Sequence, residues 1–204
     1  MKKWWLWVGL CLLLVGCSPR ASAEEKVLAA LNGMAGYEAE VQLTRVSNKG
    51  TNTYEGKQFF RQADGAYRLE LTAPENVAGN YTVFDGTRIC QYNPKVDSKV
   101  VLDVPESQPR NELFLGQFMA HYNVDPAAVA IREDWEGIDC LVLSADMGGD
   151  SPYLDTEKLW VETKEQKPVR LEIYDDTGTA RYTVDYQSFT YDPEFAEGVF
   201  AIPD

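Results

Sequence analysis

The stretch Tyr37-Glu-Ala-Glu-Val-Gln-Leu-Thr44 has an apolar residue at every second position, with polar residues between them. Successive side chains of a β-strand point to opposite faces. This alternation therefore predicts a strand with one buried and one solvated face, as in an antiparallel sheet. The same period recurs in residues 66–71, 169–173 and 182–186. We therefore expect strands of this kind along most of the chain.

Turn-forming residues separate the alternating runs. Asp64-Gly65, Asn93-Pro94 and Asp176-Thr-Gly178 are examples, and such signals often lie about ten to fifteen residues apart, as in the hairpins of a meander. We expect about eleven strands, near residues 37–47, 53–63, 66–73, 79–85, 87–93, 97–104, 127–133, 138–146, 156–163, 168–176 and 179–190.

Two segments show helical spacing instead. Residues 24–34 repeat apolar side chains at positions such as Val27 and Leu31, and residues 111–122 do so after Asn111, which we expect to cap the helix. The predicted fold is therefore mainly β with helices, of the α+β class. We expect a strongly curved antiparallel sheet of about eleven strands, a half-barrel, with two or three helices over its concave face.

The first residues indicate export. Two lysines precede an apolar run of about a dozen residues, which is shorter than the roughly 20 residues that cross a bilayer. The sequence Leu14-Val15-Gly16-Cys17 resembles the bacterial lipobox. In that motif a cysteine after a small residue receives a diacylglyceryl group before the signal is cut off. The resemblance implies lipidation of Cys17, and the alternative is an ordinary secretory signal with an incidental cysteine.

These features predict the organisation of the chain. We expect a signal peptide at residues 1–16, a lipid-anchored tether at 17–25 and a single domain at 26–204, since no composition shift or long linker marks a second domain. The mature protein would lie on the extracytoplasmic face of the cell membrane. Two or more acyl chains are enough for stable anchoring, whereas one chain binds only marginally.

The charge balance excludes two classes of partner. The chain has 19 Lys and Arg against 32 Asp and Glu, a formal charge of −13, and loss of the two lysines in residues 1–16 would leave −15. Nucleic-acid binding relies on Lys and Arg clusters, and no basic run follows residue 3. The acidity also excludes purely electrostatic adsorption to an anionic membrane.

Two cysteines would remain after processing and lipidation, namely Cys90 and Cys140. In an exported protein, an even remainder of two indicates a disulfide, and closing a loop of about fifty residues would stabilise the fold by about 4 kcal/mol. The alternative is two buried free thiols that act as small hydrophobic residues. The sequence leaves both open.

No enzymatic motif stands out. His121 is the only histidine, so a multi-histidine metal site is excluded, and we expect no cofactor and no metal. The acidic pairs Glu133-Asp134 and Asp175-Asp176 could in principle suggest a glycosidase, whose two carboxylates act together. Neighbouring strand residues point to opposite faces, however, so we interpret both pairs as solvated charge. Aromatic residues could line a lipid cavity, or, more simply, pack in the core. They are Phe59, Phe60, Phe114, Phe118, Tyr122, Trp135 and Trp160.

The layout resembles a known family. Leu159-Trp-Val-Glu-Thr163, then Lys167-Pro-Val-Arg-Leu-Glu-Ile-Tyr174 and a closing Val199-Phe200, are similar to the LolA/LolB-like fold of bacterial lipoprotein-sorting proteins. The stretch from Asn48 to Phe60, followed by Tyr67-Arg-Leu-Glu70, is most similar to GerS-type germination lipoproteins of spore-forming Firmicutes. These motifs are scaffold patterns and mark no active site.

The resemblance implies two functions. GerS-type proteins are non-enzymatic partners of a cortex-modifying cell-wall amidase in spore formation and germination, whereas LolA-like proteins hold acyl chains on the concave face. A protein anchored at Cys17 cannot ferry cargo alone, so the accessory role is the first hypothesis and lipid or lipoprotein binding the second. The open edges of such a sheet also allow homodimerisation by strand exchange.

Overall fold

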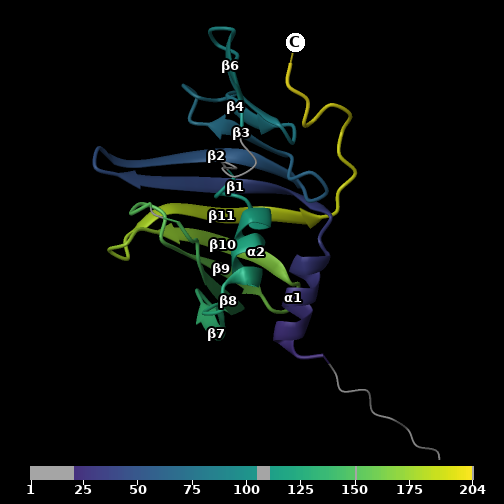
Figure 1. The fold of residues 1–204 in the computed structure, drawn as a ribbon, viewed down its shortest axis with the longest axis vertical. Coiled ribbons are helices and arrows are strands. Elements are labelled where there is room, and N and C mark those ends of the chain that lie inside the picture. The colour runs from purple at the N-terminus through teal and green to yellow at the C-terminus, as the bar shows by residue number, and fades with distance from the viewer. Residues whose placement is uncertain (1–20, 105–110, 150, 204) are drawn as a thin grey trace, which may run out of the picture.

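The computed structural model describes residues 21–104, 111–149 and 151–203, in which a curved sheet packs against two helices (Figure 1). The helices are α1 (Ala23–Gly33) and α2 (Leu115–Val124). The strands are β1 (Gly36–Ser47), β2 (Gly50–Arg61), β3 (Tyr67–Ala73), β4 (Tyr81–Phe84), β5 (Arg88–Asn93), β6 (Ser98–Asp103), β7 (Val129–Trp135), β8 (Ile138–Asp146), β9 (Thr156–Glu162), β10 (Lys167–Tyr174) and β11 (Ala180–Tyr191). Neither helix is long and apolar enough to cross a membrane.

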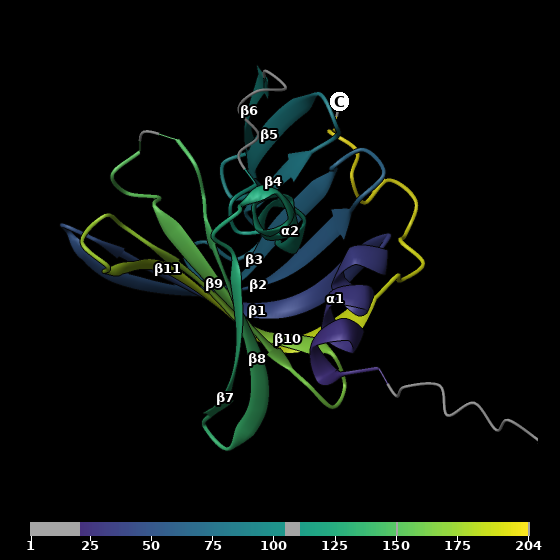
Figure 2. The same cartoon turned by 60° about the horizontal axis from the view of Figure 1, so that its bottom comes forward.

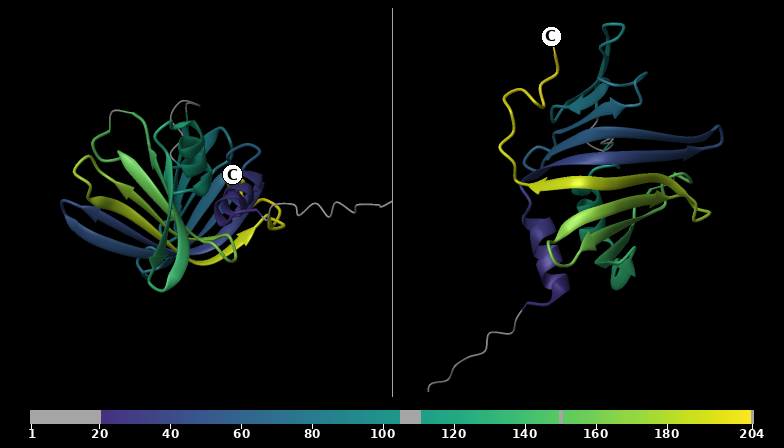
Figure 3. Two further views of the ribbon diagram at one scale, coloured as in Figure 1. Left: turned by 90° about the horizontal axis from the view of Figure 1, so that it is seen from below. Right: turned by 180° about the vertical axis from the view of Figure 1, so that it is seen from behind.

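All eleven strands of the described residues form one sheet, in the order β6-β5-β4-β3-β2-β1-β11-β10-β9-β8-β7. Every neighbouring pair is antiparallel, and all but one are consecutive in sequence. The exception is the pairing of β1 with β11, which joins the two halves of the chain. The sheet is an open curve (Figure 3), and β6 and β7 are its two edges.

Alternate strand residues face the concave side, where both helices lie (Figure 2). The helices add their own buried side chains to those of the strands, so one apolar cluster fills the interior. Its buried members are Val27, Leu31, Met34, Tyr37, Ala39, Val41, Leu43, Phe60, Tyr67, Ile89, Phe114, Leu115, Phe118, Met119, Leu141, Leu143, Leu159, Val161, Leu171, Val184 and Phe189.

The strand predictions are confirmed. All eleven strands form where the alternation places them, with ends that differ by at most three residues. The described residues contain two helices, the lower of the two numbers expected. The first begins at Ala23, within the segment predicted as a tether, because Ser22 caps it. The Ser22 hydroxyl accepts a hydrogen bond from the Glu25 amide, and the Glu25 carboxylate accepts one from the Ser22 amide.

The prediction that Asn111 caps the second helix is wrong. Residues 111–114 form a turn, in which the Phe114 amide donates to the Asn111 carbonyl, and α2 starts only at Leu115. Phe114 takes the N-cap position with no side-chain hydrogen bond. Its ring is buried, with its centroid 4.6 Å from that of Tyr67. Packing of this ring thus determines where the helix begins, which local capping chemistry does not reveal.

Gly116 is the point at which α2 approaches the sheet most tightly. A Cβ atom at this position would overlap the ring of Phe60, which lies on the concave face of β2. We expect Gly116→Ala to destabilise the fold by about 1–3 kcal/mol, because a packed core must shift to admit the added methyl group. The measurement is the free energy of unfolding from urea titration.

Gly33→Ala is the matched control, because it adds the same methyl group at the end of α1, where no atom lies within 4 Å. It should leave stability unchanged or raise it by up to about 1 kcal/mol. Equal effects of the two substitutions would contradict the proposed close packing of α2 on β2.

Candidate functional site

A chain of hydrogen bonds inside the core holds the start of α2. The Tyr37 hydroxyl, from β1, donates to Gln58 Oε1 of β2 at 2.9 Å, and Gln58 Nε2 donates to the Leu113 carbonyl at 3.0 Å. The Leu115 amide in turn donates to the Tyr37 oxygen at 3.3 Å. Gln58 is completely buried, and its pairing removes the cost of a polar group in the core. Two strands therefore position the helix through polar contacts as well as packing.

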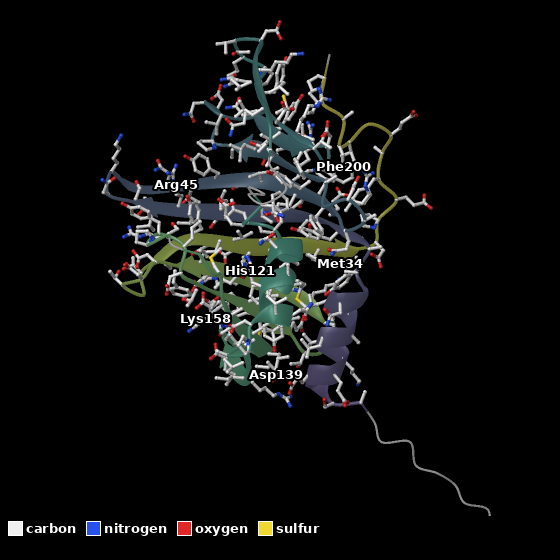
Figure 4. The ribbon with its side chains drawn as sticks, viewed as in Figure 1. Met34, Arg45, His121, Asp139, Lys158 and Phe200 are labelled. Carbon is white, nitrogen blue, oxygen red and sulfur yellow. The ribbon has the colours of Figure 1, made fainter. Side chains whose placement is uncertain are left out.

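A second polar group holds the other end of α2. His121 Nδ1 lies 2.7 Å from Glu157 Oε1 of β9, and His121 Nε2 lies 2.6 Å from Gln117 Nε2, one turn earlier (Figure 4). An arrangement in which Nδ1 donates to the carboxylate and Nε2 accepts from the amide satisfies both contacts. The only histidine thus connects the helix to the sheet.

Glu157 is the residue of this group whose burial costs the most free energy. Its side chain has no exposed surface, and its second oxygen, Oε2, has no hydrogen-bond partner among the described residues. Burial raises the pKa of its carboxyl group, and the bond from His121 opposes that rise. Burial also raises the pKa values of Tyr37 and Tyr186. The interior therefore favours the neutral forms of these groups.

The predicted aromatic set does not line one cavity. Phe60, Phe114 and Phe118 are buried in the interior, and Tyr122 packs against the same cluster. Trp160 faces the convex side of the sheet instead, where Trp135 packs against it, and Phe59 alternates with the buried Phe60 and so shares that convex side. The core interpretation holds for the first four residues, and side chains of the protein itself occupy the interior.

The acidic pairs have structural roles. Asp175 is buried rather than solvated, which corrects the sequence interpretation. Its carboxylate accepts bonds from the Thr177 hydroxyl at 2.6 Å, from the amides of Thr177 and Thr179, and from Arg181 at 2.5 Å. These partners, the hydroxyl first, hold its pKa at about 2. Glu133 accepts a bond from the indole of Trp160 at 2.7 Å. No group of three His, Cys, Asp or Glu residues able to hold a metal ion occurs in the described ranges.

Cys90 and Cys140 are both free and buried. They lie on β5 and β8, with seven strands between them in the sheet. A disulfide requires Cα atoms within about 7 Å, so of the two alternatives the structure has the buried free thiols. Burial raises the pKa of the Cys140 thiol to about 11, which suppresses its reactivity. Cys17 and the predicted signal peptide lie outside the described residues.

One part of the concave face remains open. A groove of about 370 Å³ lies over the arm formed by β3, β4, β5 and β6, beyond the reach of the helices. No charged side chain lines it, and its floor mixes apolar groups with amides and hydroxyls. The lining residues are Leu69, Leu71, Asn80, Tyr81, Thr82, Gln91, Tyr92, Asn93, Ser98 and Val100.

Several other exposed apolar groups lie on the two edge strands. Val100, Val101 and Leu102 of β6 are exposed, as are Val129 and Ile131 of β7. An edge strand also presents backbone N–H and C=O groups that no neighbour pairs, so such edges are sites of protein association. The described surface is thus suited to binding.

Comparison with known proteins follows this geometry. The family model for sporulation protein YdcC-like matches residues 1–200. The chain belongs to this sporulation protein family. A search of curated proteins found no match. Among solved structures, an uncharacterized conserved protein from Thermus thermophilus shares the fold, with 12% identity and a TM-score of 0.58 over 90% of this chain and 95% of that one.

Two further solved structures are similar to this chain. The structure of the CwlD amidase from Clostridioides difficile in complex with the GerS lipoprotein gives 26% identity and a TM-score of 0.49, over 87% of this chain and 98% of the other. The LolA superfamily protein NE2245 from Nitrosomonas europaea gives 14% identity and a TM-score of 0.45, over 90% and 99%.

The sequence analysis did not identify two buried polar residues in the interior of this protein. Gln58 and Glu157 occupy positions on the buried face of alternating strands, where an apolar residue is expected. That break in the alternation was the available signal. Their partners were not predictable, because Leu113 is 55 residues from Gln58 and His121 is 36 residues from Glu157.

Glu157→Gln tests the buried carboxyl group. The folded protein raises its pKa above the ordinary value of 4.5, so the unfolded chain ionises first and wild-type stability falls as the pH rises past that value. Glutamine cannot ionise. We therefore expect the stability of the variant, relative to wild type, to increase from about pH 4 to about pH 6, measured by urea unfolding.

Glu162→Gln on the same strand is the control. Glu162 pairs with Cys140 in the register and faces the convex side, so this change removes one negative charge without touching the interior. A relative stability of Glu157→Gln that does not change with pH would show that Glu157 titrates alike in the folded and unfolded states.

Proposed function

We propose that this protein is a non-enzymatic lipoprotein that acts in spore formation and germination as the accessory partner of a cell-wall amidase. The supporting observation is that its own helices and side chains pack the concave face of the half-barrel, while exposed apolar groups are found on both edge strands and along one groove. A protein built this way offers surfaces to a partner. Membership of a sporulation family supports the cellular context.

The absence of a catalytic arrangement in the described residues supports the non-enzymatic part. The only histidine is partly buried and engaged with Glu157 and Gln117. The buried thiols and the paired carboxylates have structural surroundings. A nucleophile with an adjacent base in an accessible cleft, which hydrolysis requires, is not found among these groups.

The proposed partner class is that of the CwlD amidase, which the GerS lipoprotein binds in the Clostridioides difficile complex. The proposed place of action is the extracytoplasmic face of the membrane, with lipid at Cys17 as the anchor. The second hypothesis, an acyl-chain carrier, finds less support, because the interior is filled and half of the residues lining the open groove are polar.

Binding of the amidase is the direct test. We expect the full chain in mild detergent to co-elute with the purified cell-wall amidase of the same organism, with a Kd of about 1 µM or lower, as measured by calorimetry. An unrelated lipoprotein of similar negative charge is the control for electrostatic adsorption. A failure to bind, together with no amidase among proteins cross-linked to the chain in sporulating cells, would contradict the proposed function.

The anchor has its own test. Cys17→Ser removes the thiol that the lipidation chemistry requires, so the protein should move from the membrane fraction to the soluble extracytoplasmic fraction. Cys11→Ser is the matched control, because Cys11 lies in the predicted signal peptide, and it should leave the protein in the membrane. Immunoblots of separated fractions measure the outcome, and equal membrane retention of both variants would rule out anchoring at Cys17.

A further inference from the structure

Strand β6 is an unusual edge. It is the last strand of the sheet, and all six of its residues are exposed. Val100 and Leu102 on one face each have 53% of their surface exposed, and Val101 on the other has 38%. Edge strands are commonly protected by charged side chains, bulges or proline, because an apolar edge readily pairs with another chain. Three consecutive apolar residues at the centre of β6 have no such protection.

The backbone groups of β6 that point outward can be identified. In an antiparallel pair, residues alternate between those bonded to the neighbouring strand and those whose N–H and C=O point away from it. The Val104 amide donates to the Thr87 carbonyl of the β5 side, so Val104 and every second residue before it face β5. The backbone groups of the intervening residues, Lys99, Val101 and Asp103, therefore point away from β5, on the side where no described strand pairs with β6.

The sequence of β6 is complementary to itself. In an antiparallel pairing of two copies with a two-fold axis at Val101, this residue lies opposite its own counterpart, and Lys99 lies opposite Asp103 of the other copy. The outward N–H and C=O groups of all three residues then pair across the edge. Val100 lies opposite Leu102 on the concave side. We propose that β6 pairs with β6 of a second copy in this register and joins two sheets into one.

The charges favour this occupant. The Lys99 ammonium group donates to the carbonyl oxygen of Pro203 at 2.9 Å, and neither Lys99 nor Asp103 takes part in an ion pair of the described residues. Both charges are thus available. In the symmetric pairing each lysine faces an aspartate of the other copy, and the two cross-strand ion pairs are identical, as an isologous interface requires.

The opposite edge provides a contrast. Strand β7 has the sequence Val-Ala-Ile-Arg-Glu-Asp-Trp, and the same operation about its centre places Arg132 opposite Arg132 and Ile131 opposite Glu133. Arg132 is also engaged by Asp139 at 2.6 Å, and Glu133 by Trp160. Like charges directly opposite each other are unfavourable. Self-pairing about the strand centre is therefore favoured for β6 and not for β7, and β7 remains open in the proposed dimer.

The register can be tested with cysteines. Val100 and Leu102 form a non-hydrogen-bonded cross-copy pair with Cα atoms about 4.5 Å apart, within the range of a disulfide. Two copies of Val100, or two of Leu102, lie on a diagonal of about 7–8 Å, beyond that range. We expect V100C and L102C chains, mixed in mild detergent and then oxidised, to form a disulfide-linked dimer on a non-reducing gel.

Either variant alone, the wild type, and a mixture of V129C and I131C on β7 are the controls. Each should give less than about a tenth of that dimer, by densitometry of the same gel. Absence of the V100C–L102C dimer in the mixture, or equal yields from V100C alone, would overturn the proposed pairing. The full chain is used throughout.

Charge reversal gives a second, independent measurement. Lys99→Glu places like charges opposite each other twice, so the dimer dissociation constant in analytical ultracentrifugation should rise about tenfold or more. Adding Asp103→Lys restores both opposite-charge pairs and should restore the wild-type constant. A dissociation constant that stays unchanged in the single variant, or is not rescued in the double variant, would overturn the proposal. Neither experiment involves the amidase, so the proposed function stands or fails separately.

Discussion

The docking of α2 on the concave face is the contact on which this structure depends. A curved sheet that does not close into a barrel leaves an apolar face open to water, and the hydrophobic effect requires that face to be covered. Here α2 approaches so closely at Gly116 that no side chain fits between its backbone and Phe60. Hydrogen bonds through Gln58 and Glu157 secure its two ends. With α1 beside it, the helix fills the half-barrel from within.

Because side chains of the protein fill the interior, the surfaces that can bind a partner lie outside it. Exposed apolar groups remain on the two edge strands and in the groove over the β3–β6 arm. The histidine and the carboxylates whose arrangement could suggest chemistry are engaged in structural contacts. Binding of other proteins along strand edges would fit an accessory role in a sporulation family. The self-complementary sequence of β6 suits the association of two copies.

The alternation of apolar and polar residues was sufficient to predict where the strands lie, because most strands pair with their neighbours in sequence. Residues 37–44 and their counterparts alternate regularly, and a strand with one wet face has no other way to hide its apolar residues. The helix at 115–124 was placed four residues early, because Phe114 is held by distant rings rather than by a cap. Asp175 was misread for a different reason, because the turn that follows it folds back and brings Thr177, Thr179 and Arg181 onto its carboxylate.

The sequence alone determined the strand count, the presence of two helical segments and the absence of a recognisable catalytic motif, because these depend on residue type and spacing within short windows. It also carried the resemblance of residues 14–17 to a lipobox and the family resemblance. Only the tertiary structure decided that the interior is filled, that Cys90 and Cys140 lie far apart, and that β6 ends the sheet with Lys99, Val101 and Asp103 facing outward. These properties arise from contacts between residues distant in the chain, which local patterns do not encode.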